Sequence, residues 1–109
     1  YYSEGNLEKA GRLITEALEL HGNYPDLHKI QGDIRLKAGE LQAAIDSYQQ
    51  SLSINPEYAD AVFGLVVALR RDGDGREGDR LLRDYIRKHP SNLMARTLLT
   101  VEKMKIPDV

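Results

Sequence analysis

Residues 73 to 78 read Gly-Asp-Gly-Arg-Glu-Gly, the GxGxxG spacing that cradles the pyrophosphate of a dinucleotide in some folds. That chemistry needs a strand before the first glycine, whereas residues 59–71 have helical spacing, and Asp74 and Glu77 would repel phosphate. The same stretch imitates the start of a calcium loop, but Glu77 stands where such a loop needs glycine and Arg83 where it needs an acid. We therefore interpret residues 72–75 as a turn between two helices.

Other reactive side chains show no catalytic or metal-binding spacing. His21, His28 and His89 have no cysteine partners and no helical pairing, which argues against a structural zinc site. Serine, histidine and aspartate all occur, but nothing marks one of them as a nucleophile. The sequence therefore predicts no enzyme, no metal and no cofactor.

The composition is that of an ordinary soluble globular domain. Of 109 residues, 41% are hydrophobic and 29% charged, with a net charge of −2, which argues against a nucleic-acid-binding surface. No apolar run approaches the ~18 residues of a membrane span, so we expect no membrane insertion. No targeting segment is visible and no cysteine is present, so the localisation stays unknown.

The elements that must position any site are helices, and the central pair spans residues 25–56. Apolar residues recur at helical spacing in both arms: Leu27, Ile30 and Ile34 in the first, and Leu41, Ala44, Ile45, Tyr48 and Leu52 in the second. Gly39 lies between the arms, where a left-handed residue can end a helix, and Pro56 closes the unit. Neither arm can bury its apolar stripe alone, so the pair needs neighbours of its own kind.

When the sequence is aligned with itself at a shift of about 34 residues, similar helix pairs fall on either side of the central one. The aligned columns are Gly5, Gly39 and Gly73; Ala10, Ala44 and Gly78; Ile14, Tyr48 and Leu82; Leu18, Leu52 and Ile86; and Gly22, Pro56 and Pro90. The unit resembles the tetratricopeptide repeat, whose pattern is W-x2-L-G-x2-Y, then A-x3-F, then P. The central unit has His28-x2-Gln31-Gly32-x2-Arg35, Ala44-x3-Tyr48 and Pro56, and the next has Val62-x2-Leu65-Val66-x2-Leu69, Gly78-x3-Leu82 and Pro90.

The resemblance implies an all-α fold of antiparallel helix hairpins stacked as a right-handed superhelix, an α-solenoid. A single domain over residues 1–109 would hold a partial first repeat (1–22), a second (25–58), a third (59–92) and a C-terminal helix (93–109) that is a cap or a truncated repeat. We expect helices at about 7–21, 59–71, 76–88 and 92–105, with Asn6 and Ser91 as caps. Because Tyr1 occupies the column of Arg35, and no initiator methionine is present, we expect a fragment of a longer protein.

In this family partners bind the concave groove lined by the first helix of each hairpin. Helical geometry leaves ten residues as candidates for that groove: Lys29, Asp33, Leu36, Lys37, Phe63, Val67, Arg70, Arg71, Val101 and Met104. We expect a solvent-facing Phe63 to form, with Val67, an apolar strip that has a basic edge. Such a strip suits a partner with a bulky apolar anchor and nearby acidic residues.

The predicted function is therefore a protein–protein interaction scaffold that binds a peptide or a partner helix. Two alternatives stay open: self-association as a homo-oligomer or packing within one longer chain, and an accessory repeat region of a larger enzyme or an envelope polysaccharide-export protein. A chaperone-type carboxylate clamp fits poorly. Only Lys29 matches that clamp, whose other places hold Asp33, Gly64, Met94 and Leu98.

Two packing predictions follow from departures from the repeat pattern. Val66 is larger and Gly78 smaller than their counterparts one repeat earlier, so we expect Val66 to pack over Gly78. Gln31 and Arg35 replace a usual leucine and tyrosine, so we expect Gln31 to find a hydrogen-bond partner and the Arg35 head to reach water or an acid. Gly11 lies inside a helix, and the sequence offers no reason for it.

Overall fold

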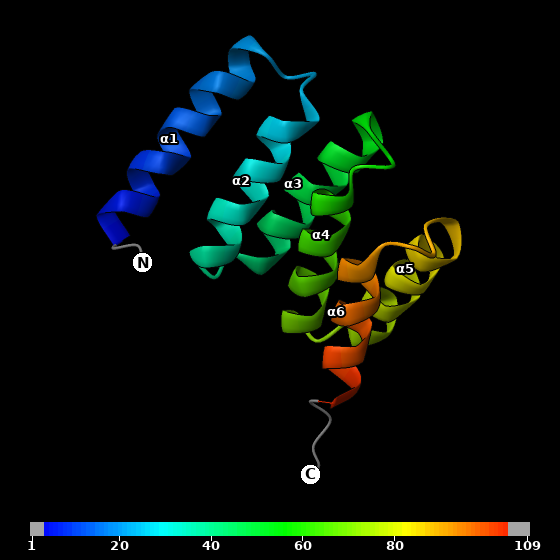
Figure 1. The fold of residues 1–109 in the computed structure, drawn as a ribbon. Helices are drawn as coiled ribbons and strands as arrows, with labels where there is room; N and C mark the ends of the chain where they lie inside the picture. The colour runs from blue at the N-terminus through cyan, green and yellow to red at the C-terminus, as the bar shows by residue number, and fades with distance from the viewer. Residues whose placement is uncertain (1–3, 105–109) are drawn as a thin grey trace.

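A computed structural model describes residues 4–104, with side chains described for residues 5–98. Within that range the chain forms six helices: α1 (Glu4–Leu20), α2 (Pro25–Lys37), α3 (Leu41–Ile54), α4 (Ala59–Arg71), α5 (Gly75–Lys88) and α6 (Leu93–Met104). Each packs against the next, and α2 also contacts α4 (Figure 1). The expected all-α stack of helix hairpins is confirmed.

Local chemistry explains most helix ends. Pro25 opens α2, and Gly39 (φ 81°) and Gly73 (φ 90°) take the left-handed conformation after α2 and α4. Two expected caps are wrong. α1 begins at Glu4, which leaves Asn6 inside the helix, and Asn92 rather than Ser91 caps α6, because its Oδ1 accepts a bond from the Ala95 N–H at 3.0 Å.

The core consists of two apolar clusters, one on each side of α4. The first joins α3 to α4 through the buried side chains of Ala44, Ile45, Tyr48, Leu65, Ala68 and Leu69. The second joins α4 to α5 and α6 through Val62, Val66, Leu82 and Ala95. Helix α4 is therefore the central element, and burial on both sides explains its nearly continuous apolar sequence.

The Tyr48 ring is held between two helix-interior glycines. It is fully buried, and a Cβ added to Gly32 would lie 2.7 Å from its Cε1. A Cβ on Gly64 would lie 2.5 Å from its Cζ. Both approaches are shorter than real Cβ contacts, so only glycine admits the ring between α2 and α4.

The predicted close approach of Val66 and Gly78 is confirmed, but the Val66 atom involved is in the main chain. A Cβ added to Gly78 would lie 3.3 Å from the Val66 carbonyl oxygen. The small residue therefore lets α5 approach the backbone of α4.

Ile30, a member of a predicted apolar stripe, is 43% exposed, and Leu13 of α1 is 58% exposed. Ser47, one repeat period after Leu13, is only 2% exposed and bonds to side chains of α2. The described residues contain no helix ahead of α1 that could cover Leu13 in the same way. None of the described helices is long and apolar enough to cross a membrane.

Candidate interaction surface

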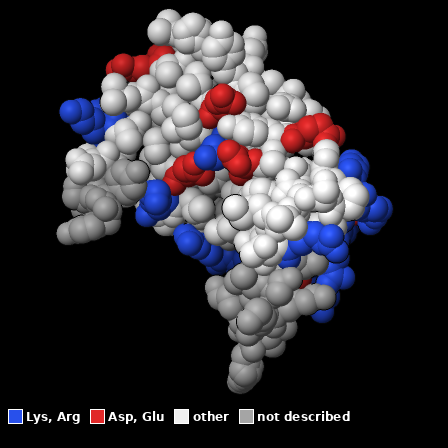
Figure 2. All heavy atoms as spheres, in the orientation of Figure 1, with Lys and Arg blue, Asp and Glu red and all other residues white. Residues whose placement is uncertain are grey.

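Helices α2 and α4 are in contact and present a charged surface, which we call the α2–α4 face. Its exposed or half-buried members are Asp26, Lys29, Asp33, Lys37, Tyr58, Asp60, Val67 and Arg71. Acidic and basic side chains alternate near the middle of the molecule in Figure 2. The same elements carry most of the predicted groove residues.

A three-residue network organises this face. The Lys29 ammonium lies 2.7 Å from Asp33 Oδ2, one helical turn along α2. The buried Tyr48 hydroxyl, which reaches the face from α3, donates to Asp33 Oδ1 at 2.5 Å. Burial, and next the Asp33 carboxylate, raise the pKa of Tyr48. The hydrogen bond to Asp33 likewise raises the pKa of Lys29, so both protons are held firmly at neutral pH.

The negative charge of the face extends from α2 to the start of α4. Asp60 adds to the upward shift of the Lys29 pKa, so its carboxylate acts on the same ammonium. Burial raises the pKa of Tyr58, and the Asp26 carboxylate raises it further. Lys29 therefore lies among carboxylates from both inner helices.

Not all predicted groove residues lie open on this face. Leu36 packs against the first core cluster, and Arg70 pairs with Asp79 of α5 at 3.0 Å, so both turn toward neighbouring helices. Phe63 is half-buried rather than solvent-facing. Its ring packs on the second core cluster and meets Tyr85 edge-on, with centroids 5.7 Å apart.

The remaining groove candidates differ in accessibility. Lys37 and Arg71, which share one repeat position, are exposed, and Val67 is half-buried. The side chains of Val101 and Met104 lie outside the described residues. A Phe63→Ala change would remove core contacts as well as a surface group, so Phe63 cannot separate binding from stability.

Gln31 and Arg35 share one buried partner, Ser47 of α3. The Ser47 hydroxyl donates to Gln31 Oε1 at 2.9 Å and accepts from Arg35 Nη1 at 3.0 Å. Arg35 Nη1 also donates to the Ala43 carbonyl at 3.4 Å. The partner expected for Gln31 is confirmed. The Arg35 head binds a hydroxyl and a carbonyl and pairs with no acid among the described residues, and because Arg35 is only half-buried the expected contact with water stays a prediction.

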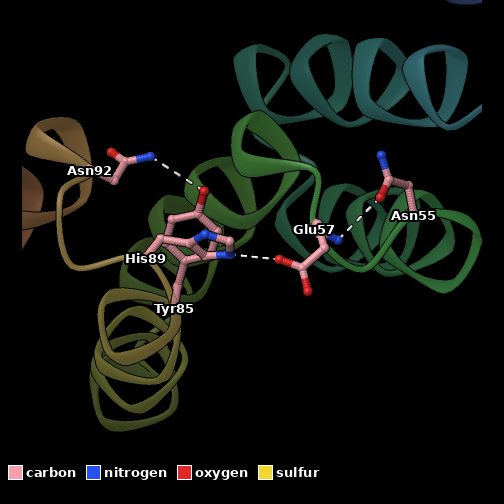
Figure 3. A network of polar contacts seen from close by, with 5 residues as sticks. All are labelled: Asn55, Glu57, Tyr85, His89 and Asn92. Carbon is pink, nitrogen blue, oxygen red and sulfur yellow. Dashed lines mark hydrogen bonds and ion pairs between the residues drawn. The ribbon is translucent and has the colours of Figure 1, made fainter.

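A second polar network, which the sequence did not suggest, links two loops about one repeat apart (Figure 3). His89 Nε2 lies 2.5 Å from Glu57 Oε1, and the imidazole packs on Tyr85 with ring centroids 4.4 Å apart. Asn92 donates to the Tyr85 hydroxyl at 3.3 Å. These contacts tie the α3–α4 loop to the α5–α6 loop. Among residues 5–98 no three metal-ligating side chains gather at one point.

Comparison with known proteins identifies the repeat. A sequence profile of the TPR repeat, the tetratricopeptide repeat, matches residues 32–73. The crystal structure of MamA superimposes with a TM-score of 0.79 at 23% identity, covering 89% of this chain and 57% of that chain. This likeness establishes the fold and nothing further.

Curated relatives are much longer than this chain. Cellulose synthase operon protein C of Komagataeibacter xylinus is 36% identical over 83 residues, which are 73% of this chain and 6% of that protein. Its counterpart in Xanthomonas axonopodis pv. citri is 35% identical over 79 residues, 72% of this chain and 5% of that protein. A tetratricopeptide repeat and J domain-containing co-chaperone of Cryptococcus neoformans is 31% identical over 86 residues, 78% of this chain and 16% of that protein.

Proposed function

Because the helix hairpins of this chain are tetratricopeptide repeats, we propose that it is an interaction scaffold whose α2–α4 face binds a peptide or helix of a partner protein. The Lys29–Asp33–Tyr48 network is the observation that carries this proposal. It holds opposite charges in fixed positions on a surface helix, and it does so with a buried hydroxyl from another helix. Fixed charges favour partners of matching charge pattern and reject others.

The charge distribution describes the partner segment. Exposed Lys37 and Arg71 suit acidic side chains, while Asp60 and Asp26 suit a basic one. Half-buried Val67 offers a small apolar contact between them. Val101 and Met104 of α6 remain proposed contacts, and their side chains lie outside the described residues.

Photo-crosslinking in the source organism tests the location. A benzophenone amino acid placed at Arg71 should capture one discrete partner, whereas the same group at Arg83, which is exposed on α5, should not. Equal capture of that partner from both positions would overturn the assignment of the face. Cross-links that join two copies of this chain would replace it with self-association.

Affinity measurements with the captured partner provide the second test. Arg71→Glu should weaken binding by about tenfold or more in calorimetry, because it reverses a charge on the face. Arg83→Glu makes the same charge change elsewhere and should leave the affinity unchanged. Both positions are exposed, so neither variant should lower the thermal midpoint appreciably.

A second candidate function rests on the two cellulose synthase operon relatives. In this alternative the chain is part of the repeat region of a larger protein that serves exopolysaccharide production. In-frame deletion of these residues from the chromosomal gene should then reduce the secreted glucan that cellulase releases as glucose. Unchanged glucan, with the shortened protein still present at its normal level, would exclude this candidate.

A further inference from the structure

An open cleft of about 850 Å³ lies between α1, α2 and the α2–α3 turn, and Lys37 is its one residue in common with the α2–α4 face described above. Its apolar lining comprises Leu7, Gly11, Ile14, Ile34 and Ala38. Gln31 and Arg35, the two residues that depart most from the repeat pattern, also line it. The cleft therefore gathers three features that the stacking of repeats does not require: a helix-interior glycine, an amide and a guanidinium.

Comparison with the next repeat shows how the cleft arises. One period after Gly11 stands Ile45, which is buried in the first core cluster with Leu65 and Leu69. Those two leucines are the counterparts of Gln31 and Arg35. A Cβ added to Gly11 would have no atom within 4 Å, so this glycine serves no close approach. The space that an isoleucine fills in one repeat interface is thus left open in the other.

Arg35 gives this space a chemical preference. Its guanidinium is half-buried and is oriented by Ser47 Oγ at 3.0 Å and the Ala43 carbonyl at 3.4 Å. No carboxylate of the described residues pairs with it. A partly desolvated guanidinium in a fixed orientation favours a carboxylate, which can accept its remaining N–H groups.

We propose that this cleft is a second binding site, which takes a partner peptide segment carrying one carboxylate next to an aliphatic side chain. The aliphatic group occupies the space beside Gly11 and Ile14, and the carboxylate meets Arg35. The cleft is also lined by three acidic residues, Glu8, Glu16 and Glu40, and by two further basic ones, Arg12 and Lys37, so its charges balance and favour a segment of mixed charge over a polyacidic one.

Amide shift mapping of the whole chain tests this proposal with a defined probe. Acetyl-Leu-Glu-Leu-amide should shift the Gly11 amide signal and bind about tenfold more tightly than acetyl-Leu-Gln-Leu-amide. The Gly64 amide, on the other inner helix, should stay in place. Equal binding of both peptides, shifts confined to the α2–α4 face, or no shift at Gly11 would each overturn the proposal.

Matched variants locate the effect. Gly11→Ile, which copies Ile45, should abolish peptide binding, whereas Gly11→Ala adds only a methyl group and should retain most of it. Arg35→Leu, which copies Leu69, should remove the preference for the glutamate peptide. If the Gly11 signal moves with protein concentration in the absence of peptide, a second copy of the chain covers the cleft and the proposal fails.

Discussion

The substitution Gly64→Ala is predicted to destabilise the fold through the ring of Tyr48. A Cβ at residue 64 would lie 2.5 Å from Tyr48 Cζ and 3.0 Å from Cδ1. The ring cannot move aside, because Gly32 closes its opposite side and its hydroxyl is bonded to Asp33 at 2.5 Å. The added methyl group therefore forces α2 or α4 to shift.

Two opposing terms set the magnitude. Alanine is favoured over glycine inside a helix by about 1 kcal/mol, whereas overpacking a closed core costs about 1–3 kcal/mol. At this contact distance we place the overpacking cost at the upper end, which leaves a net loss of about 1–2 kcal/mol. Gly11→Ala is the matched control. It has the same helix propensity and no neighbouring atom within 4 Å, so it should stabilise by about 1 kcal/mol.

Urea denaturation followed by circular dichroism measures both changes. The Gly64→Ala midpoint should fall and the Gly11→Ala midpoint should rise. Tyr48→Leu, which removes the ring, should reduce the penalty of Gly64→Ala when the two are combined. Equal gains in stability from both alanine substitutions would refute the argument that the ring excludes a side chain at residue 64.

Three further predictions concern other contacts. Gly78→Leu should lower the free energy of unfolding by about 1–3 kcal/mol, since a Cβ added there would lie 3.3 Å from the Val66 carbonyl oxygen; an unchanged urea midpoint would contradict this. Tyr48 has its pKa raised by burial and by Asp33, so the folded state holds this proton more tightly and stability falls as pH rises above the unfolded value of 10.0. Tyr48→Phe removes this ionisable group, so the decrease of the urea midpoint between about pH 8 and about pH 11 should be smaller in the variant. Ser47→Ala removes the hydrogen-bond partner of Gln31 Oε1 and one of the two acceptors of Arg35 Nη1, and it should cost about 1–3 kcal/mol in the same assay, whereas a neutral effect would contradict this.

Prediction from the sequence was most successful for the helices and their order. The expected helix at residues 59–71 coincides with α4, and the other described helix ends differ by a few residues at most. Periodicity and turn glycines are local signals, which explains this agreement. The caps were less predictable, because Ser91 and Asn92 are both good cap residues and only the path of the chain selects between them.

The sequence predicted which helices carry the candidate site residues, but it did not predict which of those side chains are exposed. Helical spacing placed Phe63, Leu36 and Arg70 on the inner face, and each turns instead toward a neighbouring helix. Spacing along one helix gives only the approximate direction in which a side chain points. Whether a side chain in that direction reaches solvent depends on helices distant in sequence, and a single sequence does not show where those helices pack.

The sequence by itself determined that this protein is a stack of helix hairpins, because its apolar period and its glycines at residues 39 and 73 act within a few residues of themselves. Only the tertiary structure decided what the interior glycines do. Gly32 and Gly64 admit the ring of Tyr48, while Gly11 opens a cleft. The residue type is the same in all three cases. The difference arises from the atoms that neighbouring helices bring near the missing Cβ, and packing between helices alone sets those distances.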